Sequence, residues 1–318
     1  METNLSNVVE ITSKVAKYDA SVKEVLADKQ VLSRILKYSL EEFKDIELED
    51  IMRSMDEPVV SGIRMEPGQT NLSKIVKYSE EDTVPGEGKI FYDIRFAVYL
   101  GEEMIKFLIN VEAQKSSDSN KLQYHLDNRI IYYLARMISA QKEVEFEKSN
   151  YDDIKDVYSI WICMDTEADE DSIIELGLQP RVIYGNTSWL PQRSIMNGAV
   201  IRIRSRADVE ESKNRLIAML EVLFSGRARQ DKMNQLEEYG LEMTTELEGC
   251  VNDMCNISDL LVEESEERGE RRGMERGEKQ ARLDSIRTLM RKLNQTAEEA
   301  MDTLDIEEKD RETYRKLL

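Results

Sequence analysis

The chain has 318 residues, 41% of them hydrophobic, which is enough for one or two domains with an apolar core. Lys and Arg number 44 against 64 Asp and Glu, and the net charge of −20 excludes a uniformly basic nucleic-acid-binding protein, so phosphate contacts would need local basic patches. A single histidine excludes a two-histidine metal centre, and the usual glycine-rich nucleotide loops are missing from the sequence, which leaves acid-and-metal chemistry for an enzyme.

The first part of the chain predicts helices. Residues 1–20 are weakly patterned and indicate a short helix or a loose arm. Residues 22–44 carry apolar side chains at helical spacing, which predicts an amphipathic helix with Asp28 as a cap for its main part. Residues 56–88 are polar with Gly and Pro, which predicts loops, and Ile75–Tyr78 is the candidate for an early strand.

Two β-rich stretches predict a hairpin that pairs two carboxylates. Gly88–Leu100 and Met104–Lys115 flank the turn signal at Gly101–Glu103. Folding this hairpin brings Asp93 roughly opposite Glu112, and strand alternation places Glu112 and Gln114 on one face. Two converging carboxylates suit Mg²⁺ or Mn²⁺, whereas isolated carboxylates on strands usually face solvent.

A long helix is predicted over residues 121–146, after the break SSDSN at 116–120. Its predicted core stripe contains Leu122, Leu126, Ile130, Leu134, Met137 and Ile138. The opposite stripe contains His125, Arg129, Tyr132 and Arg136, at spacings that place them along one face. This stripe predicts either a track for a DNA backbone or an ordinary polar helix face.

Two further strands are predicted. Val157–Met164 is almost entirely apolar, as expected for a central strand buried on both faces. Ala199–Ser205 alternates, with Arg202 and Arg204 on one face, and predicts an exposed or edge strand. Residues 176–207 contain five Arg and no Asp or Glu, which makes them the basic part of an acidic chain.

The hairpin pattern D-x18-E-x-Q resembles the PD-(D/E)XK nuclease superfamily. The surrounding segments look like the Rpn-type recombination-promoting nucleases, often labelled transposases, over about residues 25–260. The segments that carry this resemblance are DKQVLSRILKYSLEEFKD (Asp28–Asp45), YDIRF (Tyr92–Phe96), INVEAQK (Ile109–Lys115), YYLARMISAQ (Tyr132–Gln141) and VYSIWICM (Val157–Met164). The resemblance implies an α/β fold with a restriction-endonuclease-like αβββαβ core, a mixed sheet and a helical C-terminal extension.

The resemblance also implies an activity, that of a metal-dependent DNA endonuclease. It implies Asp93, Glu112 and Gln114 as catalytic residues, with Asp93 and Glu112 holding Mg²⁺ or Mn²⁺. Arg129, Tyr132, Arg136 and Lys115 are the candidate DNA contacts. The family's first helix sometimes lends an acid to the metal site, and the sequence does not distinguish Asp28, Glu41 and Glu42 for this role.

Two positions depart from the superfamily pattern. Tyr92 stands where Pro often precedes the Asp, and Gln114 stands where Lys is usual. A Gln can orient water or phosphate but carries no positive charge, and alternation directs Lys115 to the other face. A catalytically degenerate nuclease fold that binds DNA or assembles proteins is therefore the alternative.

The C-terminal part predicts helices and a charged tail. Val209–Phe224 has a helical apolar stripe, and further helices are predicted to about Leu261. In the tail, Gly269, Gly273 and Gly277 lie four residues apart, and an apolar stripe runs from Ile286 to Met301 with a break near Asn294. This pattern indicates either a self-associating helical segment, and thus a homo-oligomer, or a flexible charged linker.

These patterns predict four parts: an N-terminal arm at 1–20, a nuclease-like core at 21–207, a helical extension at 208–262 and the tail at 263–318. Three scattered cysteines indicate a reducing compartment. No stretch approaches 18 apolar residues and no basic-then-apolar leader begins the sequence. We therefore expect a cytoplasmic protein with DNA as its partner, no membrane span and no nucleotide cofactor.

Overall fold

The computed structural model describes residues 4–60, 81–84, 88–101, 104–166, 170–189, 194–204 and 211–318. The chain divides into two compact units, Met1–Ser258 and Asp259–Leu318, which are described separately. The division lies close to the expected start of the tail at residue 263. The helix α9 (Thr245–Leu293) contains the boundary.

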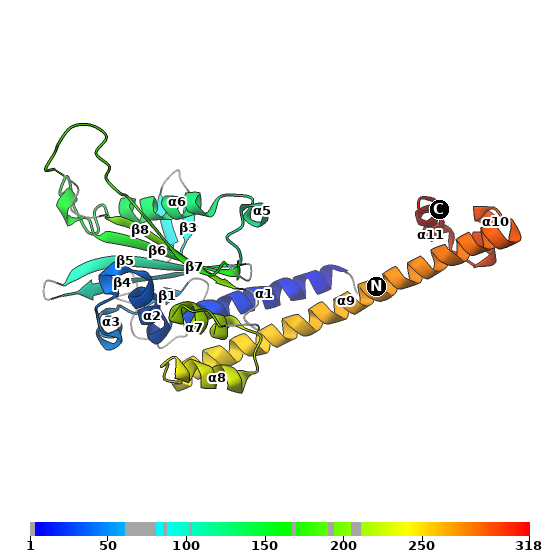
Figure 1. Cartoon of the computed structure of the whole chain (residues 1–318), viewed down its shortest axis with the longest axis horizontal. Coiled ribbons are helices and arrows are strands. Elements are labelled where there is room, and N and C mark those ends of the chain that lie inside the picture. Colours follow the sequence, from blue (N-terminus) through cyan, green and yellow to red (C-terminus); the bar gives the residue numbers. More distant parts are fainter. Residues whose placement is uncertain are drawn as a thin grey trace. The chain divides into compact units, whose positions relative to one another are not determined.

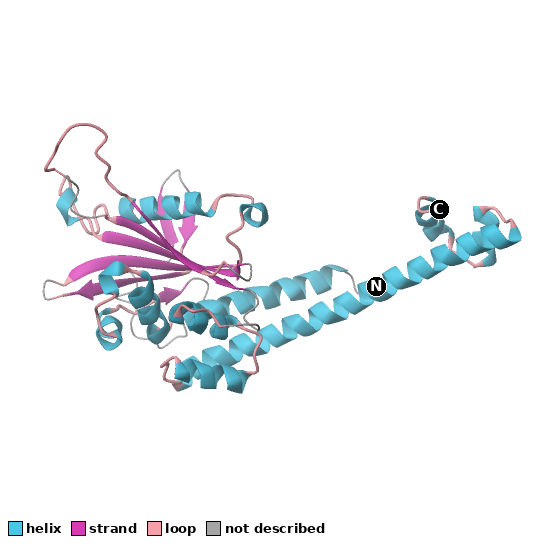
Figure 2. Cartoon of the chain, in the orientation of Figure 1, coloured by secondary structure: helices cyan, strands magenta, loops and turns pink. Residues whose placement is uncertain are grey.

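The first unit is built on a mixed six-stranded sheet in the order β1-β4-β5-β6-β8-β7 (Figure 2). The strands are β1 (Val59–Val60), β4 (Ile94–Leu100), β5 (Ile105–Gln114), β6 (Asp156–Thr166), β7 (Ser172–Gly177) and β8 (Met196–Arg204). The β5/β6 and β6/β8 pairs are parallel, and the other pairs are antiparallel. The predicted α/β class with a mixed sheet is confirmed. β2 (Glu81–Val84) and β3 (Gly88–Phe91) form a separate antiparallel pair.

Helices cover both faces of the sheet (Figure 1). On one face lies α6 (Leu126–Ser139), and on the other lie α1 (Asn4–Leu26), α2 (Lys29–Ser39) and α7 (Arg215–Phe224). The other helices are α3 (Leu48–Ser54), α5 (Ser119–Leu122), α8 (Arg229–Glu238), α10 (Ala297–Thr303) and α11 (Glu308–Arg315), with 3-10 turns at Glu41–Phe43 and Tyr151–Asp153. Both faces of β6 are therefore buried, which explains its continuous apolar sequence.

The core residues follow the predicted stripes. Beneath α6, the side chains of Ile130 and Met137 are fully buried against Leu108 and Trp161. On the other face, α2 buries Val31, Leu32, Ile35 and Leu36 against the sheet. Complete burial of one such aliphatic side chain contributes about 2 kcal/mol, so these two layers hold the sheet between them.

The N-terminal helices differ from the prediction in their boundaries. The helix α1 runs from Asn4 to Leu26 across the expected end of the arm, and the helix expected over 22–44 is divided at Ala27 and Asp28. The Asp28 carboxylate accepts hydrogen bonds from the Gln30 and Val31 backbone N–H groups, so the predicted cap is confirmed. A cap of this kind starts a new helix because it satisfies the unpaired donors of the first turn.

Two other predicted elements are divided by local backbone geometry. The strand expected over Gly88–Leu100 is interrupted at Tyr92 and Asp93, so its first half joins β2 and its second half is β4. The helix expected over 121–146 is split by Gln123, whose φ of 63° ends α5, and α6 ends at Ser139. The predicted strand Ile75–Tyr78 lies outside the described residues.

The expectation of an edge strand at Ala199–Ser205 is wrong. Its described part, residues 199–204, belongs to β8, which lies between β6 and β7. The covering strand β7 was not recognised in the sequence. Arg202 and Arg204 do not form a free basic edge, because they pair with Glu170 and Glu221 respectively.

The second unit is a small helical cluster formed by the end of α9 with α10 and α11. α9 ends at Leu293, and Asn294 has a φ of 52°, in agreement with the predicted break. Thr296 and Glu299 form a capping box that starts α10. The buried residues are Leu283, Ile286, Ala300, Met301, Ile306 and Tyr314.

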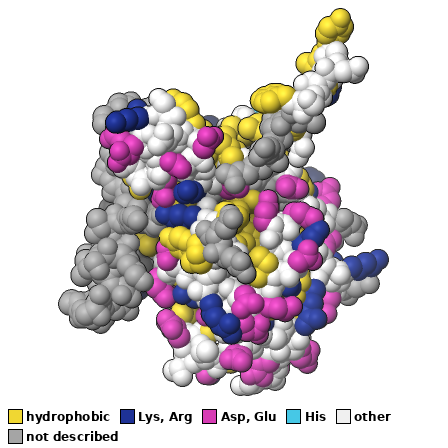
Figure 3. Space-filling model, turned by 90° about the vertical axis from the view of Figure 1, so that its left-hand side faces the viewer, with side chains coloured by type: hydrophobic (Ala, Val, Ile, Leu, Met, Phe, Trp, Pro, Cys, Tyr) yellow, Lys and Arg dark blue, Asp and Glu magenta, His cyan; other side chains and the backbone are white. Residues whose placement is uncertain are grey.

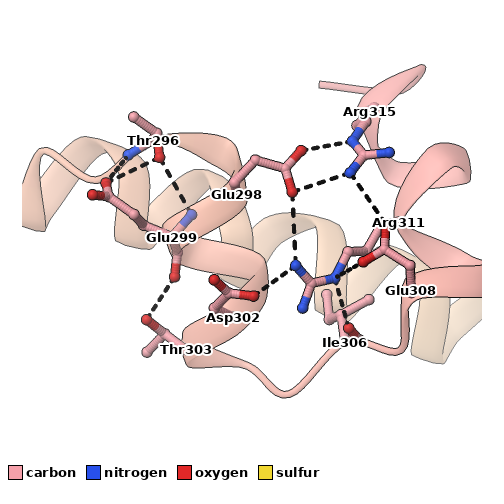
Figure 4. A network of polar contacts seen from close by, with 9 residues as sticks. All are labelled: Thr296, Glu298, Glu299, Asp302, Thr303, Ile306, Glu308, Arg311 and Arg315. Atoms are coloured by element: carbon pink, nitrogen blue, oxygen red, sulfur yellow. Dashed lines mark hydrogen bonds and ion pairs between the residues drawn. The ribbon is translucent and has the colours of Figure 1, made fainter.

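Charged side chains bridge α10 and α11, as Figure 4 shows. Arg315 binds Glu298, with Nε 2.6 Å from Oε1, and Arg311 binds Asp302 at 2.6 Å. Exposed ion pairs contribute little each, so the apolar cluster supplies most of the stability. Ile286 and Met301 are fully buried inside this unit, so part of the predicted apolar stripe is covered within one copy of the tail.

Candidate metal and catalytic site

The register of the hairpin places Asp93 against Glu112. Ile94 pairs with Val111, so Asp93 and Glu112 are the next opposed residues at the end of β4. The Asp93 N–H donates to Glu112 Oε1 at 3.1 Å, and the Ala113 N–H donates to Asp93 Oδ2 at 3.0 Å. The predicted juxtaposition is therefore confirmed, and each carboxylate is fixed by the backbone of the opposite strand.

Glu112 is buried under α6, with 3% of the residue exposed. Its Oε1 also accepts a hydrogen bond of 2.9 Å from the Asn110 amide. Burial and the neighbouring charge of Asp93 raise the pKa of Glu112 to about 8, against the opposing effects of the Asp93 N–H, Arg129 and Asn110. Without a bound cation this carboxyl therefore carries a proton at neutral pH.

Lys23 of α1 is a third ionisable group at this position. Its Nζ lies 2.9 Å from Asp93 Oδ1 and 2.8 Å from Asp19 Oδ2, and its side chain is 13% exposed. Burial acts to lower the pKa of Lys23, but the hydrogen bonds and charges of Asp19 and Asp93 outweigh it and raise the pKa above the ordinary value. Lys23 was not predicted as a site residue, because no local sequence feature connects residues 1–26 with a hairpin 70 residues later.

Arg129 lies behind Glu112 in a set of aromatic rings. Its guanidinium carbon is 5.0 Å from the centre of the Trp161 ring and 5.1 Å from that of Tyr133. It donates hydrogen bonds to the Tyr124 and Tyr133 hydroxyls at 2.7 and 2.9 Å. Cation–π contacts and hydrogen bonds together hold this positive charge in place, where it acts on the Glu112 carboxyl.

The predicted polar stripe of α6 is not one exposed face. Tyr132 is 46% exposed, but Arg136 is only 3% exposed, and Arg129 is half-buried. The prediction that these side chains lie together along the surface is therefore wrong for Arg136. The buried arc of α6 is wider than the predicted stripe and takes in Tyr133 as well as Arg136.

The remaining predicted residues divide into near and distant ones. Gln114 is half-buried at the end of β5, two residues after Glu112 on the same face, and Lys115 follows it and is exposed. Asp28 is occupied as the cap of α2. Glu41 pairs with Lys44, and both Glu41 and Glu42 are exposed.

The side chains of the site offer the oxygen ligands that a hard cation binds, but they are few. Asp93, Glu112 and Gln114 offer oxygen atoms, which Mg²⁺ and Mn²⁺ prefer. Within the described ranges, no three Asp, Glu, His or Cys side chains lie close enough together to hold a metal ion. A cation here would have two protein carboxylates, and Mg²⁺ commonly keeps several waters in such sites.

The visible surface does not supply a broad basic patch. In Figure 3, the acidic and basic side chains that are coloured lie interspersed on the face turned toward the viewer. Within the described part of the chain, no helix combines the length and apolarity needed to cross a membrane. No protein-family model, curated protein or solved structure matches the chain. Membership of a nuclease family therefore stays a prediction from the sequence.

Proposed function

We propose that this protein is a metal-dependent DNA endonuclease of the recombination-promoting type, with a restriction-endonuclease-like core. The observation that carries the proposal is the reciprocal fixing of Asp93 and Glu112 at one end of a mixed sheet. The order of α1 and α2, the strands β1, β4 and β5, then α6 and β6 is compatible with an αβββαβ core. Perturbed, paired carboxyls of this kind concentrate at functional sites.

In the proposed reaction, Asp93 and Glu112 would hold Mg²⁺, or Mn²⁺, at the scissile phosphodiester. The cation supplies two effects when bound: it lowers the pKa of water and neutralises charge at phosphorus. Glu112 must lose its proton to become a ligand, and Arg129 favours that loss through its charge. Gln114 orients the attacking water or a phosphate oxygen through its amide.

DNA is the proposed partner, and the structure changes how the candidate contacts would act. Lys115 and Tyr132 are exposed, so they can touch the backbone directly. Arg129 is held by aromatic rings and would support the site from behind through its charge, whereas the buried Arg136 would not reach the DNA backbone. Binding that relies on few exposed cations has a shallow dependence on salt.

A catalytically degenerate protein is the second candidate, and one observation favours it. Both oxygens of Asp93 are already occupied, one by Lys23 and one by the Ala113 N–H. With Gln114 in place of Lys, such a site could bind DNA or a protein partner without cutting.

Nicking of supercoiled plasmid in Mg²⁺, with an EDTA control, tests the proposal. The wild-type chain should nick the plasmid only with metal, and Asp93→Ala and Glu112→Ala should abolish nicking while circular dichroism shows a folded protein. Glu175→Ala on the exposed side of β7 is the matched control and should cut normally. A wild-type protein that binds DNA but never nicks it in Mg²⁺ or Mn²⁺ would support the degenerate alternative.

A further inference from the structure

The contact between Lys23 and Asp93 places a cation on an oxygen that a metal ion would use. Lys23 Nζ is 2.9 Å from Asp93 Oδ1, while Asp93 Oδ2 accepts the Ala113 N–H at 3.0 Å. The partner of Oδ2 belongs to the backbone of β5 and is fixed by the sheet. The partner of Oδ1 is the end of a flexible four-carbon side chain, so Oδ1 is the atom that can change partner.

Lys23 and a divalent cation cannot both hold Oδ1. Two positive charges on one oxygen would lie within a few Å of each other, where repulsion in a partly buried site is strong. Lys23 has a second partner, Asp19, at 2.8 Å, and Asp19 is half-exposed on the same helix. The ammonium can therefore leave Asp93 and remain tethered next to the site.

We propose that Lys23 is exchanged between Asp93 and the substrate phosphate. Its ammonium holds Asp93 Oδ1 while the metal is absent, and it turns to a phosphate oxygen when a divalent cation takes Oδ1. This inference rests on the proposed function. It makes Lys23 a further catalytic residue, contributed by a helix that lies outside the hairpin.

Gln114 and Arg129, which also lie near the pair, do not supply this charge. Phosphoryl transfer places negative charge on the phosphate oxygens in the transition state, and positive side chains stabilise it. The Gln114 amide is neutral, and the Arg129 guanidinium is bound to two tyrosine hydroxyls between rings. Among the described residues, Lys23 is the cation bonded directly to the Asp93–Glu112 pair.

The test compares full-length wild type with Lys23→Met and Lys23→Arg, and uses Lys106→Met as the matched control. Lys106 pairs with Glu145 at 2.6 Å, with both side chains 9% exposed, near the turn end of β5 and far along the strand from Glu112. Its loss removes a buried Lys–Glu pair without touching Asp93. Calorimetry measures Mn²⁺ binding, and plasmid nicking measures cleavage in Mg²⁺.

In Lys23→Met, Mn²⁺ affinity and cleavage rate are expected to change in opposite directions. Lys23→Met binds Mn²⁺ roughly fivefold tighter, because the competing ion pair is gone. The same variant cleaves slower by a factor on the order of 100, because the phosphate has lost its cation. Lys23→Arg keeps the charge and recovers part of the cleavage. Lys106→Met leaves the Mn²⁺ affinity as it is in the wild type. If Lys23→Met does not fold, Lys23→Gln replaces it, since Gln can still donate to Asp93 without a charge.

If Lys23 only stabilises the structure, its replacement should disorder the site, so that Mn²⁺ binding becomes weaker and cleavage becomes slower together. Unchanged or weaker Mn²⁺ binding in Lys23→Met overturns the exchange, as does failure of the wild type to bind Mn²⁺. Tighter Mn²⁺ binding with unchanged cleavage overturns the phosphate role. If the wild type does not cleave at all while Lys23→Met still binds Mn²⁺ more tightly, the competition for Asp93 is supported and the nuclease activity is wrong.

Discussion

Replacing Glu112 by Gln should make the first unit more stable, by an amount that grows with pH. Gln keeps the size of the side chain and an oxygen that can accept from the Asp93 N–H and the Asn110 amide. It removes only the ability to ionise. The change therefore isolates the cost of a buried carboxyl beside Asp93.

The size and sign of the effect follow from the pKa of Glu112. That pKa rises from 4.5 to about 8 on folding, so between these pH values the folded chain keeps a proton that the unfolded chain has lost. Stability then falls as pH rises through this window, because the folded state binds more protons than the unfolded state. At about 1.4 kcal/mol per pH unit the whole loss is roughly 5 kcal/mol, and it is complete above pH 8. The Gln variant has no such loss.

Urea unfolding followed by tryptophan fluorescence at pH 5 and pH 8.5, without metal, measures this difference, because the buried Trp161 becomes exposed while Trp189 is already exposed in the folded chain. The advantage of Glu112→Gln over wild type should be about 1 kcal/mol or less at pH 5 and several kcal/mol at pH 8.5. Glu221→Gln is the control. Glu221 is as buried as Glu112, but Arg204 binds it at 2.7 and 2.8 Å, so the Gln variant should lose about 2 to 3 kcal/mol by leaving that guanidinium without its counter-charge. An advantage of Glu112→Gln that is equal at both pH values, or that shrinks at high pH, would refute the burial argument.

Three further predictions follow from the packing. Arg129→Met should destabilise the first unit by about 2 kcal/mol, since it removes two hydrogen bonds and the contacts with Trp161 and Tyr133. It should also raise the pKa of Glu112 further, which carboxyl-selective NMR titration measures, and an unchanged pKa would count against the charge effect. Gly273→Ala and Gly277→Ala should each stabilise α9 by about 1 kcal/mol in thermal melts, because a Cβ at either position meets nothing within 4 Å. A loss of stability together with a smaller species in light scattering would instead indicate the predicted self-association through these glycines. Tyr184→Ser and Trp189→Ser should each change the unfolding free energy by about 0.5 kcal/mol or less, because these side chains are 97% and 76% exposed. A larger effect in urea titration would show that the segment containing these two side chains packs on the rest of the protein.

The hairpin could be predicted from the sequence because its determinants are local. Alternating side chains and a tight turn fix the register of β4 and β5, and the register alone brings Asp93 to Glu112. The interruption at Asp93 was less visible, because GKIFYDIRF continues the β-rich composition on both sides of it. Composition shows which residues favour a strand, but it does not show which partner strand each half will join.

The surroundings of the pair could not be predicted, because they arrive from distant parts of the chain. Glu112 is buried by α6 and β6, whose residues 129, 133 and 161 follow it by 17 to 49 positions. Lys23 precedes Asp93 by 70 positions and lies on α1, which the sequence divides between the predicted arm and the predicted amphipathic helix. The same limit explains why the burial of Arg136 and the internal position of β8 in the sheet were not predicted. Helical spacing gave the direction of the buried stripe of α6 without its width. The strand at 172–177, which pairs with β8, has no fully buried residue to mark it.

The choice of Glu rather than Gln at position 112 is itself an argument for a ligand. A Gln could accept the same two hydrogen bonds, and at neutral pH it would avoid most of the roughly 5 kcal/mol that ionisable burial costs. The placement of Asp93 beside it adds to that cost, since its charge raises the pKa of Glu112. Such an arrangement serves packing poorly. It would suit the proposed site, in which a divalent cation would replace the proton of Glu112 and the ammonium on Asp93 and would offset the repulsion between the two carboxylates.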